Sequence, residues 1–211
     1  MKRFAPIFAL LLALSLLASG GVQAASVNTS AKFDWHVSDA FIQTMAGPNQ
    51  TGAVAKASDS GAFIGHSVRV SGTGTMNTAA MNATGGGTFV HTDATGQVVA
   101  FGTWTATSLK SFTFFGCDTG PFPADFCGGV AVMSLHVVAT TTNPAMGQVQ
   151  ADGEIWVNCR IHAPAGNTDE EGIKLKVFLN PTTTVDFDRP QPPFENGETL
   201  FVSRSQSGAS K

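Results

Sequence analysis

The alternation of apolar and polar residues from Val68 onward most constrains how this chain can fold. Neighbouring side chains of a β-strand point to opposite faces, so a two-residue period buries one face and leaves the other in water. Helical spacing is nearly absent from the sequence. We therefore predict an all-β protein in which eight to ten strands form. The expected runs span residues 31–38, 63–76, 86–92, 97–107, 109–115, 130–140, 147–151, 154–162, 172–180, 184–188 and 198–204.

Turn signals separate several of these runs. Residues 93–96 (DATG) and Asp152-Gly153 tolerate positive φ, so both predict tight hairpins. Asn196-Gly197 is a third turn signal. The Pro-rich run 189–193 lacks the N–H groups that a sheet needs and is expected to run outside it. Residues 39–62 predict either a long loop or a short helix over one end of the fold.

Consecutive hairpins with one apolar face must pack on a second sheet or close on themselves. The spacing of the hairpins is short and sequential, which favours closure. We therefore predict an antiparallel β-barrel of about eight strands, with a two-sheet β-sandwich as the alternative. The residues expected to line the core include Ala131, Met133, Leu135, Val137, Ile173, Leu175, Val177 and Leu179.

The first 24 residues have the pattern of an export signal. Lys2 and Arg3 precede an apolar stretch at 7–17, and residues 22–24 (VQA) place small side chains before a cut ahead of Ala25. The stretch is shorter than the roughly 20 residues that span a bilayer, and no second long apolar run follows. We expect a single domain over residues 25–211 with a frayed C-terminal tail, a secreted or periplasmic location, and no membrane span after cleavage.

The charge balance argues against a nucleic-acid partner. Without Lys2 and Arg3, ten of the 12 basic residues remain against 15 acidic ones, and the bases are scattered along the chain. Binding a phosphate backbone requires clustered Lys and Arg. We therefore expect no nucleic-acid partner.

The cysteines fit an oxidising compartment. Cys117 and Cys127 bracket the loop CDTGPFPADFC, in which two Pro and one Gly favour a chain that turns back, so we predict a disulfide between them. A bridge across a loop of this size stabilises by about 2–4 kcal/mol. Cys159 lies among the apolar positions of an expected strand and is predicted to be a buried thiol that packs as a small hydrophobe.

The segment GGGTFVHTDATGQVVAFGTWTATSLKSFTFFG at 85–116, together with EGIKLKVF at 171–178, resembles uncharacterised secreted bacterial β-domain proteins. Its hairpin is also loosely similar to the Gly-rich strands of allene oxide cyclase-like and dirigent-like barrels. The resemblance implies an exported β domain. It carries no biochemical function and no catalytic residues onto this chain.

The five histidines do not have the one- or three-residue spacing that builds a local metal site, so we predict no metal and no cofactor. His136 shares its parity with Val130, Val132 and Val138, which would enclose it if that face is covered. With a carboxylate nearby, His136 or His91 could act as an acid or base in an isomerase or lyase.

An aromatic set supports a different function. Phe101, Trp104, Phe112 and Phe114 exceed what one thin core needs, so we expect non-enzymatic binding of a small apolar ligand, or an interaction role, with these side chains in the site. Alternatively, the aromatic residues only fill the core, and the barrel is packed by its own side chains without a pocket. A third alternative is a structural surface protein, which would have no internal pocket and would expose Phe122 and Phe126.

Overall fold

The computed structural model describes residues 32–46, 52–58, 61–190 and 198–204. Within them the chain is all-β, as predicted, and eleven antiparallel strands form one sheet. The strands β2 and β10 were not expected from the sequence. The strands are β1 (Lys32–Val37), β2 (Ala53–Lys56), β3 (Ser67–Asn77), β4 (Asn82–Thr92), β5 (Val98–Cys117), β6 (Phe126–Thr141), β7 (Gln148–Cys159), β8 (Gly172–Asn180), β9 (Thr183–Phe187), β10 (Arg189–Pro190) and β11 (Thr199–Arg204).

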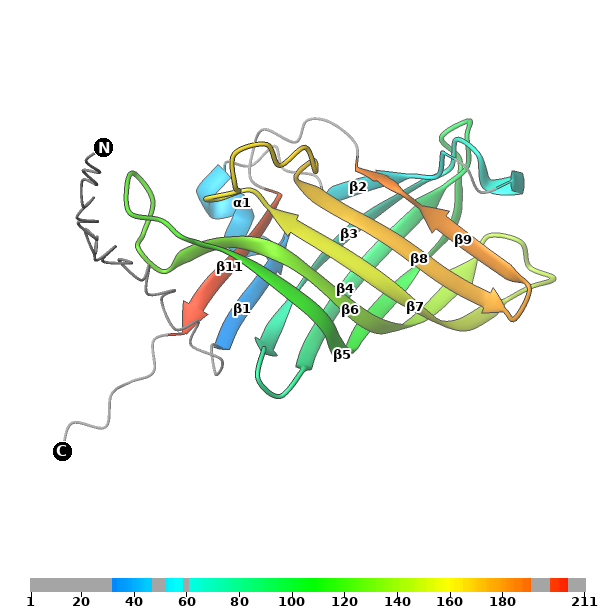
Figure 1. The fold of residues 1–211 in the computed structure, drawn as a ribbon. Helices are drawn as coiled ribbons and strands as arrows, with labels where there is room; N and C mark the ends of the chain where they lie inside the picture. The colour runs from blue at the N-terminus through cyan, green and yellow to red at the C-terminus, as the bar shows by residue number, and fades with distance from the viewer. Residues whose placement is uncertain (1–31, 47–51, 59–60, 191–197, 205–211) are drawn as a thin grey trace, which may run out of the picture.

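Two hydrogen-bonded routes connect β3 with β6. One runs through β4 and β5, and the other runs through β1 and β11. Strands β7, β8 and β9 continue the sheet beyond β6, while β2 and β10 continue it beyond β3. In Figure 1, β7, β8 and β9 cross in front of β2, β3 and β4 at an angle. The apolar faces of these two sets of strands enclose the interior.

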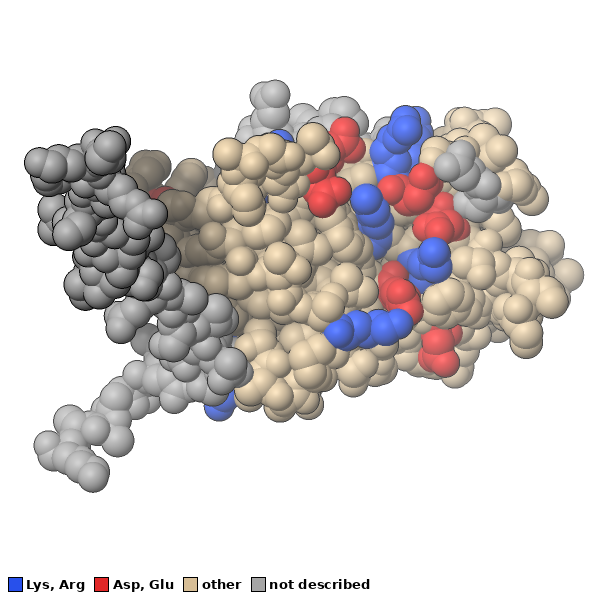
Figure 2. All heavy atoms as spheres, viewed as in Figure 1, with Lys and Arg blue, Asp and Glu red and all other residues tan. Residues whose placement is uncertain are grey.

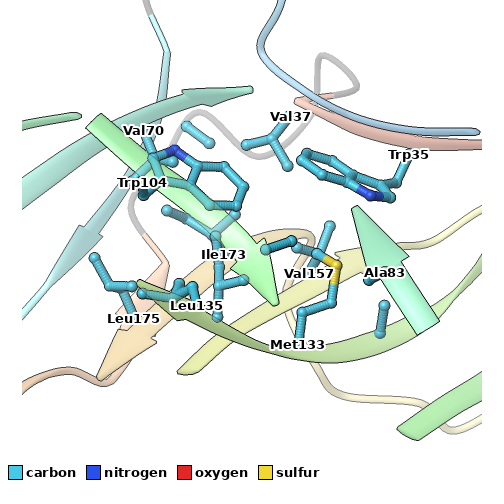
Figure 3. Close-up of a cluster of buried hydrophobic side chains, with 14 of the residues drawn as sticks. Trp35, Val37, Val70, Ala83, Trp104, Met133, Leu135, Val157, Ile173 and Leu175 are labelled. Atoms are coloured by element: carbon cyan, nitrogen blue, oxygen red, sulfur yellow. The ribbon is translucent and has the colours of Figure 1, made fainter. Parts of the chain in front are cut away.

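The alternation correctly predicted most of the side chains that face the interior. Of the predicted core residues, Leu179 near the end of β8 is instead 39% exposed. Ala131, Met133 and Leu135 of β6 are buried, as are Ile173 and Leu175 of β8. Figure 3 shows Leu135, Ile173 and Leu175 converging from different strands on the space beside Trp104. Burial of these apolar side chains is the main favourable contribution to folding.

Two stacked indoles lie against the glycine-rich part of β3 and β4. The rings of Trp35 and Trp104 are 5.4 Å apart and stacked. A Cβ at Gly72 would come within 2.5 Å of the Trp104 ring, and one at Gly74 would come equally close to the Trp35 ring. Only glycine therefore leaves room for both indoles at these positions.

Strand β5 joins two runs that the sequence separates. Its buried positions Trp104 and Ala106 are two residues apart, whereas Leu109 follows after three. The pairing with β6 shifts at this point and again between Leu109 and Ser111. A β-bulge adds one residue to a strand without ending it, so the predicted break between 97–107 and 109–115 was wrong.

The hairpin predicted at Asp152-Gly153 was also wrong, because both residues lie inside β7. Gly153 pairs with Leu135 and Val177. A Cβ at Gly153 would lie 2.4 Å from the backbone oxygen of Lys176. The glycine thus serves close packing between strands rather than a turn. The other predicted turn, at 93–96, does connect β4 to β5.

The segment from 39 to 62 contains the short helix α1 (Ala40–Ala46), strand β2 and a 3₁₀ turn η1 (Gly61–Phe63). Asp39 caps α1 by accepting a hydrogen bond of 3.0 Å from the backbone N–H of Ile42. The Pro-rich run begins inside the sheet, because Arg189 and Pro190 form β10 beside β2, at an edge where proline is tolerated.

Three of the predicted features lie outside the described residues, namely the export signal at 1–24, the turn at Asn196-Gly197 and most of the C-terminal tail, at 205–211. No helix among the residues that the structure does describe is long and apolar enough to cross a bilayer.

The outer face of β5 to β9 carries paired charges. Lys110 pairs with Glu154, and Lys176 Nζ lies 2.8 Å from Asp186 Oδ2. Figure 2 shows basic side chains in blue and acidic side chains in red, which alternate in a band across an otherwise largely uncharged face. The polar residues that alternate with the buried ones therefore face solvent on these strands. Exposed ion pairs of this kind contribute little to stability.

Candidate functional site

A cavity of about 400 Å³ lies inside the fold, where β3 and β4 face β7, β8 and β9. The first half of β5 and the second half of β6 complete its wall, and the β6–β7 connection borders it through Thr141, Thr142 and Asn143. The wall is otherwise apolar apart from one histidine. Its lining side chains include Val70, Trp104, Ala139, Ala151, Leu175 and Phe187.

Small side chains on three neighbouring strands leave this space open. Ala100, Ala139 and Ala151 line the cavity from β5, β6 and β7. Elsewhere the interior is filled by large, fully buried side chains such as Trp35 and Phe201. A strand keeps its inward direction whether the inward residue is large or small, so three inward alanines on neighbouring strands produce a hollow rather than a change of fold.

His91 is the one titratable side chain among the described residues of the wall. Its Nε2 lies 2.9 Å from Nδ1 of His66, which reaches it from the end of β3. The His91 ring also meets the Phe187 ring edge-on at 5.2 Å. Burial is the main cause that lowers the pKa of His91 to about 4. The charge of His66 lowers it further, while Asp93 opposes both. At neutral pH His91 is therefore uncharged.

The sequence did not predict the His66–His91 pair. The two residues are 25 positions apart, but the antiparallel register pairs Val68 with His91, which brings His66 close. That register, set by the β3–β4 hairpin, is the signal that could have found the pair.

The four aromatic residues predicted to bind ligand separate in the structure. Trp104 lines the cavity. Phe101 is 48% exposed and is not among the described lining residues. Phe112 packs on Phe33 and Phe201 away from the cavity, and Phe114 is 44% exposed at the same end. The aromatic residues that do join Trp104 in the wall, and that the sequence did not single out, are Phe63, Phe89 and Phe187.

The other candidate histidine lies on the outer surface. His136 Nδ1 is 3.0 Å from Asp152 Oδ1, so a histidine and a carboxylate do come together as an acid–base site would require. Their side chains are 41% and 83% exposed, however, and neither is among the described lining residues. The expectation that His136 might be enclosed fails because Met133, Leu135 and Val137 take the buried parity of β6.

The cysteines have the arrangement that the sequence predicted. Cys117 and Cys127 form a disulfide at the tip of the β5–β6 hairpin. Asp118 organises the loop by accepting a 2.6 Å hydrogen bond from the N–H of Phe122, which is 55% exposed. The alternative of a structural surface protein also required an exposed Phe126, which is buried. Cys159 is a free, buried thiol.

A second group of buried titratable residues lies near the start of α1. Burial raises the pKa of Glu198 to about 8, with the nearby Glu171 carboxylate as a further cause, and burial raises the pKa of Glu171 to about 7. Ser38 anchors this group through a 2.8 Å hydrogen bond from its N–H to the Glu198 carbonyl. Burial also raises the pKa of Cys159 to about 12, which makes its thiol unreactive.

No protein-family model matches the chain, and comparisons with curated proteins and with solved structures found no match.

Proposed function

We propose that this protein binds a small apolar molecule in its internal cavity and does not transform it. The observation that carries the proposal is a hollow of about 400 Å³ whose wall is almost entirely apolar. Binding pockets for small molecules have volumes of about 300–1,000 Å³ and combine apolar walls with a few polar groups. An apolar hollow loses packing contacts, so a ligand that restores them binds favourably.

We attribute the hollow to closure of the sheet as a β-barrel. The two routes between β3 and β6 support closure over an open sandwich, because a sandwich needs no second connection. The similarity of residues 85–116 to allene oxide cyclase-like strands favours the same architecture. The export signal expected at 1–24 would place the binding activity in the periplasm or outside the cell.

Binding without catalysis is supported by the chemistry of the wall. General acid–base catalysis needs a positioned acid and base, and His91 has no carboxylate beside it among the described lining residues. The exposed His136–Asp152 pair lies outside the hollow and lacks an enclosed space for a substrate.

The test uses the uncharged fluorescent probe N-phenyl-1-naphthylamine. The probe should bind with rising emission and should quench the tryptophan signal, because Trp104 lies in the wall. Ala139→Phe fills the hollow from β6 and should reduce binding at least tenfold. Thr140→Phe places the same side chain on the opposite face of β6, at an exposed position, and should leave binding unchanged. No probe binding, or equal loss in both variants, would contradict the proposal.

A further inference from the structure

The cavity wall contains no Lys, Arg, Asp or Glu among its described residues. A ligand that carried a charge into this space would lose its hydration and find no opposite charge. That loss is large for an isolated carboxylate or ammonium group. The composition of the wall therefore selects against a charged ligand before any specific contact is considered.

The wall offers few hydrogen-bonding groups. Thr141, Thr142 and Trp104 already donate to backbone carbonyls. Asn143 lies at the border, and His91 is the one titratable group among the described lining residues.

The His91 ring is held by the 2.9 Å bond to His66 and by edge-on packing against Phe187, so its direction is set before a ligand arrives. Other groups near the pair are Asp93 in the following turn and the ring of Phe63, which lies 5.4 Å from the His66 ring. The Asp93 carboxylate accepts hydrogen bonds from the backbone N–H groups of Thr95 and Gln97 and not from either imidazole.

The bond between two neutral imidazoles can run in either direction. If His66 donates to His91 Nε2, the remaining nitrogen of His91 carries a hydrogen and is a donor. If His91 donates instead, its remaining nitrogen is an acceptor. The pair can therefore present a donor or an acceptor by changing tautomers, with no net charge in either state.

From this arrangement we infer that the cavity takes an uncharged ligand with an apolar body and one hydroxyl or carbonyl group, which His91 holds by a hydrogen bond. The inference rests on the proposed binding function and specifies the class of ligand. His66 acts as a positioning residue, since it orients the His91 ring and changes tautomer together with it. A carboxylate of the same chain length would bind more weakly.

The experiment measures displacement of N-phenyl-1-naphthylamine at pH 7.5 by three ligands of equal length, decan-1-ol, decan-2-one and decanoate. The alcohol and the ketone should compete within about threefold of each other, since one neutral hydrogen bond serves both. Decanoate should need at least tenfold higher concentration. Equal competition by decanoate and decan-1-ol would overturn the inference.

The variant His91→Phe keeps an aromatic ring against Phe187 and removes the hydrogen bond. It should lower the affinity for decan-1-ol about three- to tenfold more than it changes the affinity for the probe. His136→Phe removes a histidine from the outer face and should change neither value. His91→Gln keeps a hydrogen-bonding group and should retain part of the preference for decan-1-ol over decanoate. This variant replaces His91→Phe if the latter fails to fold.

The outcomes separate this inference from the function on which it rests. Probe binding with no effect of His91→Phe on the alcohol would overturn the role of His91 and leave the binding function standing. Absence of probe binding to the unmodified protein would overturn both.

Discussion

The interior of this protein has a filled half and a hollow half. In the filled half, near α1 and the disulfide, Trp35, Met133 and Phe201 are fully buried. In the hollow half, Ala139 and Ala151 occupy equally inward positions and leave the cavity. Both halves come from strands with the same alternation. The comparison teaches that a two-residue period decides which side chains point inward, whereas their volumes decide whether the inside is full.

The two halves also hold different buried titratable groups. The hollow half contains the His66–His91 pair, and the filled half contains the Glu171 and Glu198 carboxyls. Burial favours the uncharged form of His91 and of both glutamates, so it lowers the pKa of His91 and raises the pKa of Glu171 and Glu198. One physical cause therefore gives the two halves opposite responses to pH.

The largest expected contrast comes from one substitution made in each half. Leu135→Ala, beside the filled core, should lower the free energy of unfolding by about 3–5 kcal/mol. Leu175→Ala, in the cavity wall, should cost only about 2 kcal/mol because that side chain borders empty space and loses fewer contacts. Urea denaturation measures both values. Equal costs would mean that the hollow is filled in solution.

Loss of the disulfide should affect the filled half alone. Replacing Cys117 and Cys127 by alanine frees a loop whose ends are ten residues apart and should cost about 2–3 kcal/mol. Probe affinity should stay the same, since the cavity adjoins the other end of β5. In the unmodified, denatured and unreduced protein, thiol titration should detect Cys159 alone. Three reactive thiols would refute the bridge.

Adding volume should have opposite signs in the two halves. Ala151→Leu extends into the cavity and should raise stability by about 0.5–2 kcal/mol while weakening probe binding. Ala131→Leu adds the same atoms at a fully buried position outside the described cavity wall and should lower stability by about 1–3 kcal/mol. Thermal unfolding with and without probe measures the stability and the probe binding of both variants. Destabilisation by Ala151→Leu would contradict the presence of free space at that site.

The smallest expected effect is on the pH dependence of stability. His91 has a pKa of about 4 in the fold against about 6.5 unfolded, so the unfolded chain binds more protons and stability is lost as pH falls through this window. The glutamates are protonated in the fold, and their contribution is complete below pH about 4.5 and lost as pH rises through about 7 to 8.

Because the two windows overlap and two glutamates oppose one histidine, the combined contribution should be highest at about pH 4 to 5. It should change by about 1–2 kcal/mol on each side. His91→Phe should flatten the acidic side, and Glu198→Gln should flatten the alkaline side. Denaturation midpoints measured across pH 4 to 9 test both. Unchanged curves in the two variants would show that other groups cause the pH dependence.

The sequence predicted inward positions well and strand boundaries less well. Alternation identified Met133, Leu135 and Ile173 as core residues because burial acts on every second side chain. It failed at β5, where a bulge shifts the parity between Ala106 and Leu109, and at Gly153, where packing rather than a turn requires glycine. Both failures involve a partner strand that local sequence does not show.

The candidate site was predictable only in part. Trp104 lies in the cavity wall, whereas Phe101, Phe112 and Phe114, which the sequence grouped with it, are not among the described lining residues. The pairing of His66 with His91 depends on the β3–β4 register. Ala100, Ala139 and Ala151 line one cavity only because β5, β6 and β7 lie side by side in the sheet.

By itself, the sequence determined the class of fold, the inward-facing residues of most strands and the Cys117–Cys127 bridge, because periodicity and loop closure act between residues close in the chain. Only the tertiary structure decided where the interior is left empty and which neutral polar group faces that space. Those features arise where small side chains from distant strands meet, and the volume between them is a property of their packing together.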